Sequence, residues 1–207
     1  MISRFHLCIA DYNQAIRLKL DYAEAYCGRG TAYMGKGDYD RAIVNYNQAI
    51  RLKPDYAKAY YGRGTAYMGK EDYDQAIANY SQTIRLNPNY AEAYYGRGTA
   101  YMGKDDYDQV IADLNQAIRL KPDYAEAYYG RGTAYMGKDD YDQVIADFNQ
   151  AIRLNPNCAE AYYGRGTVYM GKDDYASASA DINKTLQINP NHSEAQFVRQ
   201  LLQILGY

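Results

Sequence analysis

The sequence predicts an all-α fold, a solenoid of antiparallel helix pairs in which each pair packs mainly on its neighbours. Shifting the 207-residue sequence against itself by 34 residues aligns five segments: 23–56, 57–90, 91–124, 125–158 and 159–192. Each segment contains two stretches whose apolar residues recur at helical spacing. Tyr occurs 27 times and Trp never, a skew expected when one short segment has been copied. We therefore expect a single repeat array over residues 1–207.

The first helix of each repeat is predicted to begin just after a Pro, at an Asp or Asn able to accept a hydrogen bond from a free helix N–H. A Glu three residues later completes a capping box in the later repeats, but Lys58 interrupts the pattern. The predicted first residues are Asp55, Asn89, Asp123, Asn157 and Asn191, and the glutamates are Glu92, Glu126, Glu160 and Glu194.

The second helix of each repeat is predicted to begin at a recurring Asp, found at Asp38, Asp72, Asp106, Asp140 and Asp174. Three residues later, Gln75, Gln109 and Gln143 offer a reciprocal cap. The residues Ile77, Tyr80 and Ile84 then form one apolar helical face. Each repeat is thus expected to be a helix–turn–helix pair.

The two ends match half-repeats. Residues 3–20 match a second helix without a first, and residues 193–207 match a first helix, expected to be a C-terminal capping helix. That last helix has broad apolar cover, which suggests self-association in which it docks on the N-terminal half-repeat of another chain. Two alternatives remain open: the helix caps its own array, or the chain is part of a longer protein. The residues predicted for self-association are Phe197, Val198, Leu201, Leu202 and Leu205.

A 34-residue helical hairpin with this pattern resembles the tetratricopeptide repeat family. The second repeat supplies the family's signature positions in order: Tyr60, Gly64, Tyr67, Ala76, Tyr80, Thr83 and Pro88. Arg63 replaces the usual Leu, Val110 and Val144 replace an Ala, and Ile182 replaces an aromatic residue. The resemblance implies a right-handed superhelical solenoid that acts as a non-catalytic protein–protein interaction scaffold.

One face of the first helices carries three rows of residues, and the resemblance places this face on the concave, ligand-facing side of the array. Tyrosine offers contact area at low entropic cost and Met adapts to irregular partners. We therefore predict a groove that binds a peptide segment of a partner protein, although packing between adjacent repeats is an alternative role for each residue. The predicted groove residues are Tyr61, Tyr95, Tyr129 and Tyr163; Thr65, Thr99, Thr133 and Thr167; and Met68, Met102, Met136 and Met170.

A subset of the family holds the C-terminal carboxylate of chaperone tails with Lys and Asn residues on this face. The corresponding positions here are Tyr61, Gly62 and Thr65, so that type of recognition is not expected. We expect Gly64 to allow close approach of the paired helices. Gly62 and Gly69 point away from that contact, and we predict that they open the groove to the ligand.

The spacing Gly98-x-x-x-x-Gly103-Lys104 recurs in every repeat and resembles part of a phosphate-binding loop. It lies in a predicted helix, whose N–H groups already have partners. The residue after Lys is never Ser or Thr; it is Gly37, Glu71, Asp105, Asp139 or Asp173. We therefore expect no nucleotide binding.

Charge and composition limit the other functions. A net charge of −2 gives no excess of positive charge, which binding to nucleic acid or to an anionic membrane would need. Five recurring arginines, Arg29 to Arg165, lie on the flank opposite the Tyr/Met rows, where we expect pairing with Asp113, Asp147 and Asp181 or solvation.

The sequence suggests no enzyme, cofactor or metal site, because the two His are far apart and no nucleophile lies beside a base. The three Cys fit neither a disulfide framework nor a zinc site. No stretch is long and apolar enough to span a membrane, and no signal sequence is evident, so we expect a cytoplasmic protein.

Overall fold

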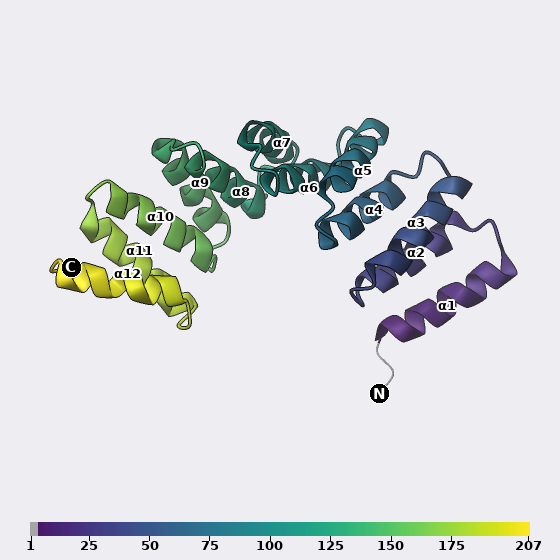
Figure 1. Ribbon diagram of the computed structural model, residues 1–207, viewed down its shortest axis with the longest axis horizontal. Helices are drawn as coiled ribbons and strands as arrows, with labels where there is room; N and C mark the ends of the chain where they lie inside the picture. Colours follow the sequence, from purple (N-terminus) through teal and green to yellow (C-terminus); the bar gives the residue numbers. More distant parts are fainter. Residues whose placement is uncertain (1–3) are drawn as a thin grey trace. The chain divides into compact units, whose positions relative to one another are not determined.

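The computed structural model describes residues 4–207, and in this part of the chain it contains twelve α-helices and no β-strand (Figure 1). Ser3, the first residue of the predicted N-terminal half-repeat, lies outside the described residues. The chain divides into two compact units, one ending at Asp106 and the other beginning at Tyr107. This boundary falls inside the third predicted repeat, 91–124.

The first unit contains six helices: α1 (Arg4–Leu18), α2 (Ala23–Met34), α3 (Tyr39–Leu52), α4 (Ala57–Gly69), α5 (Tyr73–Leu86) and α6 (Ala91–Met102). Its most extensive contacts join α2 to α3 and α4 to α5, the two helices of one predicted repeat in each case. Successive repeats meet through α1 and α2, α3 and α4, and α5 and α6. The observed helices confirm the helix pairs predicted for this unit, and α1 lies in the range predicted for a half-repeat.

The second unit contains the remaining six: α7 (Tyr107–Leu120), α8 (Ala125–Met136), α9 (Tyr141–Leu154), α10 (Ala159–Gly171), α11 (Tyr175–Ile188) and α12 (Ser193–Ile204). Here α8 pairs with α9 and α10 with α11, and α12 packs against α11.

The core of each repeat combines small residues on the first helix with one large side chain on the second. Ala59 and Ala66 are fully buried on α4, and Tyr80 on α5 is only 3% exposed. Burial of such a side chain contributes on the order of 2 kcal/mol. Its counterparts in the other repeats are Tyr46, Leu114, Phe148 and Ile182, all buried.

Glycines make room for these large side chains, as the Tyr80 ring illustrates. A Cβ on Gly64, in the same repeat, would lie 3.0 Å from this ring, and a Cβ on Gly96, in the next repeat, 2.7 Å. Gly62 lies in the same way against Tyr46, at 2.5 Å. The prediction for Gly64 is confirmed, whereas the prediction that Gly62 opens the groove is wrong: it faces the preceding repeat.

The second helices begin at the predicted aspartates. Asp38 accepts a hydrogen bond from the backbone N–H of Arg41, and Asp72 accepts one from Gln75. Asp140 and Asp174 cap α9 and α11 in the same way. These caps satisfy N–H groups that the helix leaves without partners.

The predicted start of the first helices is wrong by one residue. The N-cap residues are Tyr22, Tyr56, Tyr90, Tyr124 and Cys158, which make no side-chain cap, and His192, which does. Asp55 belongs instead to a turn in which the Tyr56 N–H donates to the Lys53 carbonyl. The Pro–Asp and Pro–Asn pairs therefore form the turn before the helix.

A left-handed residue connects the two helices of a repeat. Glu71, Asp105, Asp139 and Asp173 have φ between 57° and 59°, and Gly37 has φ 71° at the equivalent position. Glycine adopts this conformation without strain, and Asp adopts it more readily than most residues. The residue after each Lys thus has a backbone role.

Candidate functional site

In the first unit, the predicted groove residues lie in parallel rows on α4 and α6. Their side chains are half-buried, apart from the exposed Thr99. The Tyr61 ring stacks on Tyr90, with centroids 5.0 Å apart, and tilts against Tyr80 at 5.7 Å. Such pairs hold the ring in a fixed orientation. One side of the Tyr61 ring is packed, and part of it remains accessible.

In the second unit, the rows continue on α8 and α10, and all of their side chains are half-buried. The Tyr129 ring stacks on Phe148 with centroids 5.6 Å apart, and the Tyr163 ring lies 4.6 Å from the His192 ring. As in the first unit, a side chain of a second helix or of the following turn supports each tyrosine.

The Thr and Met rows also contribute to packing. The Thr65 hydroxyl donates to the Tyr61 carbonyl at 3.1 Å and accepts a hydrogen bond from the Tyr80 hydroxyl at 3.3 Å. Met68, Met136 and Met170 pack at the edges of the buried clusters. The rows are therefore partly structural, and part of these side chains remains accessible.

Three glycines at the ends of first helices do not open this surface, contrary to the prediction for Gly69. A Cβ on Gly69, Gly103 or Gly137 would lie 2.5 Å from the ring of Tyr39, Tyr73 or Tyr107 respectively. Each of these rings comes from the second helix of the preceding repeat. These three glycines make room for an aromatic ring of the same chain.

On the opposite flank, a recurring Arg joins its own repeat to the preceding one, as Arg131 and Arg165 show. Arg131 donates to both carboxylate oxygens of Asp147, at 2.8 and 2.6 Å, and to Asn115 at 2.5 Å. Arg165 forms the equivalent pair with Asp181. The hydrogen bond to Asp147 raises the pKa of Arg131, whereas burial lowers the pKa of Arg63, whose partners Asn79 and Asn47 are neutral.

The lysines beside this flank form exposed ion pairs across successive repeats. Lys172 contacts Asp142 at 2.7 Å and Lys70 contacts Asp40 at 2.5 Å, and Lys104 and Lys138 pair with Asp74 and Asp108. Exposed pairs contribute little to stability. They do compensate charge. The predicted intramolecular pairing of the arginines is confirmed for Asp147 and Asp181.

Comparison with known sequences gives the family. Sequence models described as TPR repeat or tetratricopeptide repeat match residues 8–37, 30–71, 64–105, 103–139, 125–158 and 159–192. The chain belongs to the tetratricopeptide repeat family. Among curated proteins, no sequence gives a significant match.

Solved tetratricopeptide repeat structures share the fold. YrrB, whose structure is described as a TPR protein with an unusual peptide-binding site, superposes with a TM-score of 0.75 at 24% identity, covering 91% of this chain and 97% of its own. A MamA structure covers 80% of this chain and 96% of its own at 29% identity and a TM-score of 0.73. MamA from Desulfovibrio magneticus RS-1 covers 82% and 96% at 22% identity and a TM-score of 0.75. The predicted all-α solenoid is confirmed.

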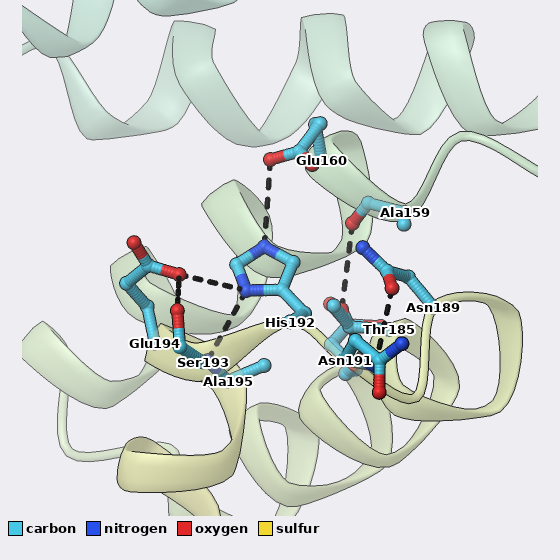
Figure 2. Close-up of polar contacts among 10 residues, drawn as sticks. Ala159, Glu160, Thr185, Asn189, Asn191, His192, Ser193, Glu194 and Ala195 are labelled. Atoms are coloured by element: carbon cyan, nitrogen blue, oxygen red, sulfur yellow. Dashed lines mark hydrogen bonds and ion pairs between the residues drawn. The ribbon is translucent and has the colours of Figure 1, made fainter.

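A polar pocket in the second unit surrounds His192, before α12 (Figure 2). The Nδ1 atom of His192 accepts a hydrogen bond from the Ala195 N–H at 3.3 Å, which caps α12. Glu194 lies 3.2 Å from this nitrogen, and Glu160 lies 3.4 Å from Nε2, an atom buried without a hydrogen-bond partner. In the other tetratricopeptide repeats the position of His192 is a Tyr or Cys, which provides no such cap.

Residues 4–207 lack two features of other functional classes. No group of His, Cys, Asp and Glu there has the geometry to hold a metal ion. No helix in this range is long and apolar enough to cross a bilayer. The N–H of Lys104, in the motif that resembles a phosphate loop, donates to the Tyr101 carbonyl. Tetratricopeptide repeat proteins are generally non-catalytic scaffolds.

The residues predicted for self-association divide into two groups. Val198 and Leu202 are buried in the cluster between α11 and α12, so they are unavailable to a second chain. Phe197 is 61% exposed and Leu205 is 54% exposed, while Leu201 is half-buried. Only part of the predicted set can make an intermolecular contact.

Proposed function

We propose that this protein is a non-catalytic scaffold that binds a peptide segment of a partner protein along the Tyr, Thr and Met rows. The observation that carries the proposal is a half-buried tyrosine in three of the repeats, Tyr61, Tyr129 and Tyr163, each held by a supporting ring and left partly accessible. Rigid aromatic side chains contribute much of the energy at protein interfaces. A peptide-binding site described for YrrB supports the proposal at the level of the fold.

The partner surface is expected to be apolar or aromatic. The rows contain no charged side chain, and the cations on the opposite flank already have partners such as Asp147 and Asp142. A ligand that binds mainly through phosphate or carboxylate groups would find few charge-assisted hydrogen bonds in these rows. Binding should therefore depend only weakly on salt concentration.

The proposal is tested with peptides selected from a random phage-displayed library on the intact chain. Peptides that bind the rows should lose about tenfold affinity or more, about 1.4 kcal/mol, when both row tyrosines of one unit are replaced. The variants are Tyr61→Ala with Tyr95→Ala for the first unit, and Tyr129→Ala with Tyr163→Ala for the second.

The matched control replaces the neighbouring tyrosines Tyr60 and Tyr94, whose rings lie under Arg63 and Arg97. These changes remove comparable rings from the same helices without touching the rows. Equal loss of affinity in the control and the row variants, or unchanged affinity in both row variants, contradicts the proposal.

A second function, self-assembly, is favoured by exposed apolar side chains at both terminal helices. Ile204 on α12 is 80% exposed, and Leu7 and Leu18 on α1 are 57% and 79% exposed. Contact between α12 of one copy and α1 of another would cover these side chains. Light scattering over a concentration series should show growth in mass that Phe197→Asp with Leu205→Asp abolishes. A constant monomer mass for the unmodified chain rules out self-assembly.

A further inference from the structure

Aromatic rings cover the glycine at the end of the first helix in four repeats, but not in the fifth. A Cβ at Gly35 would lie 2.2 Å from the Phe5 ring, and the distances from Gly69, Gly103 and Gly137 to their tyrosine rings are all 2.5 Å. At Gly171, no atom of a neighbouring helix lies within 4 Å of the equivalent point. The junction at Gly171 therefore lacks the aromatic ring that covers the equivalent glycine in the other four repeats.

The missing ring belongs to Tyr141, which has turned outwards. Tyr141 is 43% exposed, and its hydroxyl donates to Asp139 Oδ1 at 2.9 Å. Its counterpart Tyr107 is half-buried and lies over Gly137. Two positions that should behave alike thus differ within one unit.

We attribute this difference to a substitution beside the glycine. The residues that line the open space at Gly171 match their counterparts at Gly137 in type, except that Val168 replaces Ala134. Phe148, which packs against Val168, also replaces Leu114 of the preceding repeat. Val168 is 5% exposed, so its two additional methyl groups occupy space inside the junction. A β-branched side chain in a helix has almost no freedom to move aside, so the bulky ring is displaced.

The displaced ring leaves a cavity of about 270 Å³, lined by Met136, Tyr141, Thr167, Val168 and Gly171. Met136 and Thr167 are members of the rows assigned above to peptide binding. Most of the lining is apolar, and Met can adjust its shape to an inserted group. The cavity is therefore continuous with the proposed binding surface of the second unit.

We propose that this cavity holds an aromatic side chain, Phe or Tyr, of the bound peptide. The other repeats indicate which kind of side chain fits, because a Phe ring or a Tyr ring fills the equivalent space over Gly35, Gly69, Gly103 and Gly137. The outward Tyr141 ring forms one wall, against which an inserted ring can pack edge to face. This assignment rests on the proposed function, since it gives the peptide's anchor residue in the second unit.

The test uses p-cresol, the side chain of tyrosine in isolation, and the full chain labelled with ¹³C at its methionine methyl groups. The Met136 methyl signal should shift saturably with p-cresol, while the Met68 signal in the other unit stays in place. In Gly171→Leu the new side chain fills the cavity. In Val168→Ala the Tyr141 ring can turn back over Gly171. Affinity for p-cresol should fall at least tenfold in both variants.

The proposal is overturned if p-cresol produces no saturable shift in the unmodified chain, or if either variant binds it as tightly as the unmodified chain does. The Tyr61→Ala and Tyr95→Ala variant serves as a control, because it lies outside the second unit and should leave the Met136 titration unchanged. Loss of peptide binding in the row variants without any p-cresol binding would retain the scaffold function and reject the aromatic cavity.

Discussion

At the residue scale, the junctions of the first unit depend on two buried tyrosines. Tyr46 is 2% exposed and Tyr80 is 3% exposed. The Tyr80 hydroxyl donates to Thr65, and the Tyr46 hydroxyl lies 3.2 Å from the Thr31 hydroxyl. Burial raises the pKa of each phenol from 10 to about 12, because ionisation would place a charge in the core. Both rings also lie between glycines of successive repeats.

These pKa values predict alkaline destabilisation. Below pH 10 each phenol is neutral in both the folded and the unfolded chain, so these two tyrosines add no pH dependence to the free energy of unfolding. Between pH 10 and 12 the unfolded chain releases the proton and the folded chain retains it, so the free energy of unfolding falls by about 2 kcal/mol for each tyrosine. Urea titrations at pH 9 and pH 11 should show roughly half to two thirds of this loss, about 1.3 kcal/mol for each tyrosine.

Substitution of Tyr80 by Phe separates this effect from general alkaline damage. Phe148 occupies the equivalent position in the second unit, so a Phe ring fits the fold there. Tyr80→Phe should lower stability at pH 9 by about 1 kcal/mol at most, through loss of one long hydrogen bond. It should also remove part of the pH dependence. An identical pH dependence in the variant would show that Tyr80 titrates normally.

At the scale of helices, the two glycines Gly137 and Gly171 give a matched comparison. At Gly137 a methyl group would lie 2.5 Å from the Tyr107 ring, so Gly137→Ala must displace that ring. We expect a loss of about 1 kcal/mol or more in the free energy of unfolding. At Gly171 there is open space, so Gly171→Ala should instead stabilise the chain by about 0.5–1 kcal/mol through helix propensity. Urea unfolding measures both, and changes of the same sign would contradict the packing described.

Helix positions were predictable from the sequence because their signals are local. Asp38 and Asp72 cap the helices that they precede, as their sequence positions indicate. The start at Asp55 was misplaced by one residue because a turn and a cap favour the same residue types. The role of Gly69 was not predictable, since it depends on Tyr39 of the preceding repeat. The orientation of Tyr141 was not predictable for the same reason. In the sequence it is indicated only by Val168, which stands in the next repeat at a position where other repeats have Ala.

At the scale of the whole chain, stability should vary along the sequence because repeats contact mainly their neighbours. The helix α1 packs chiefly on α2, and α12 packs chiefly on α11. By contrast, α4 contacts α2, α3, α5 and α6. Helices with partners on one side can detach without disrupting the rest of their unit, so we expect local opening to begin at α1 and α12.

Native-state hydrogen exchange tests this expectation directly. Amides of α1 and α12 should exchange fastest among the helices, and those of α4 should be among the slowest. Leu202 is 1% exposed in the cluster that attaches α12, so Leu202→Ala should remove about 2–5 kcal/mol of packing energy. Because that energy belongs to the last junction, the variant should accelerate exchange in α12 and α11 and leave α4 unchanged. Uniform acceleration along the chain would instead show that the array unfolds as one cooperative body.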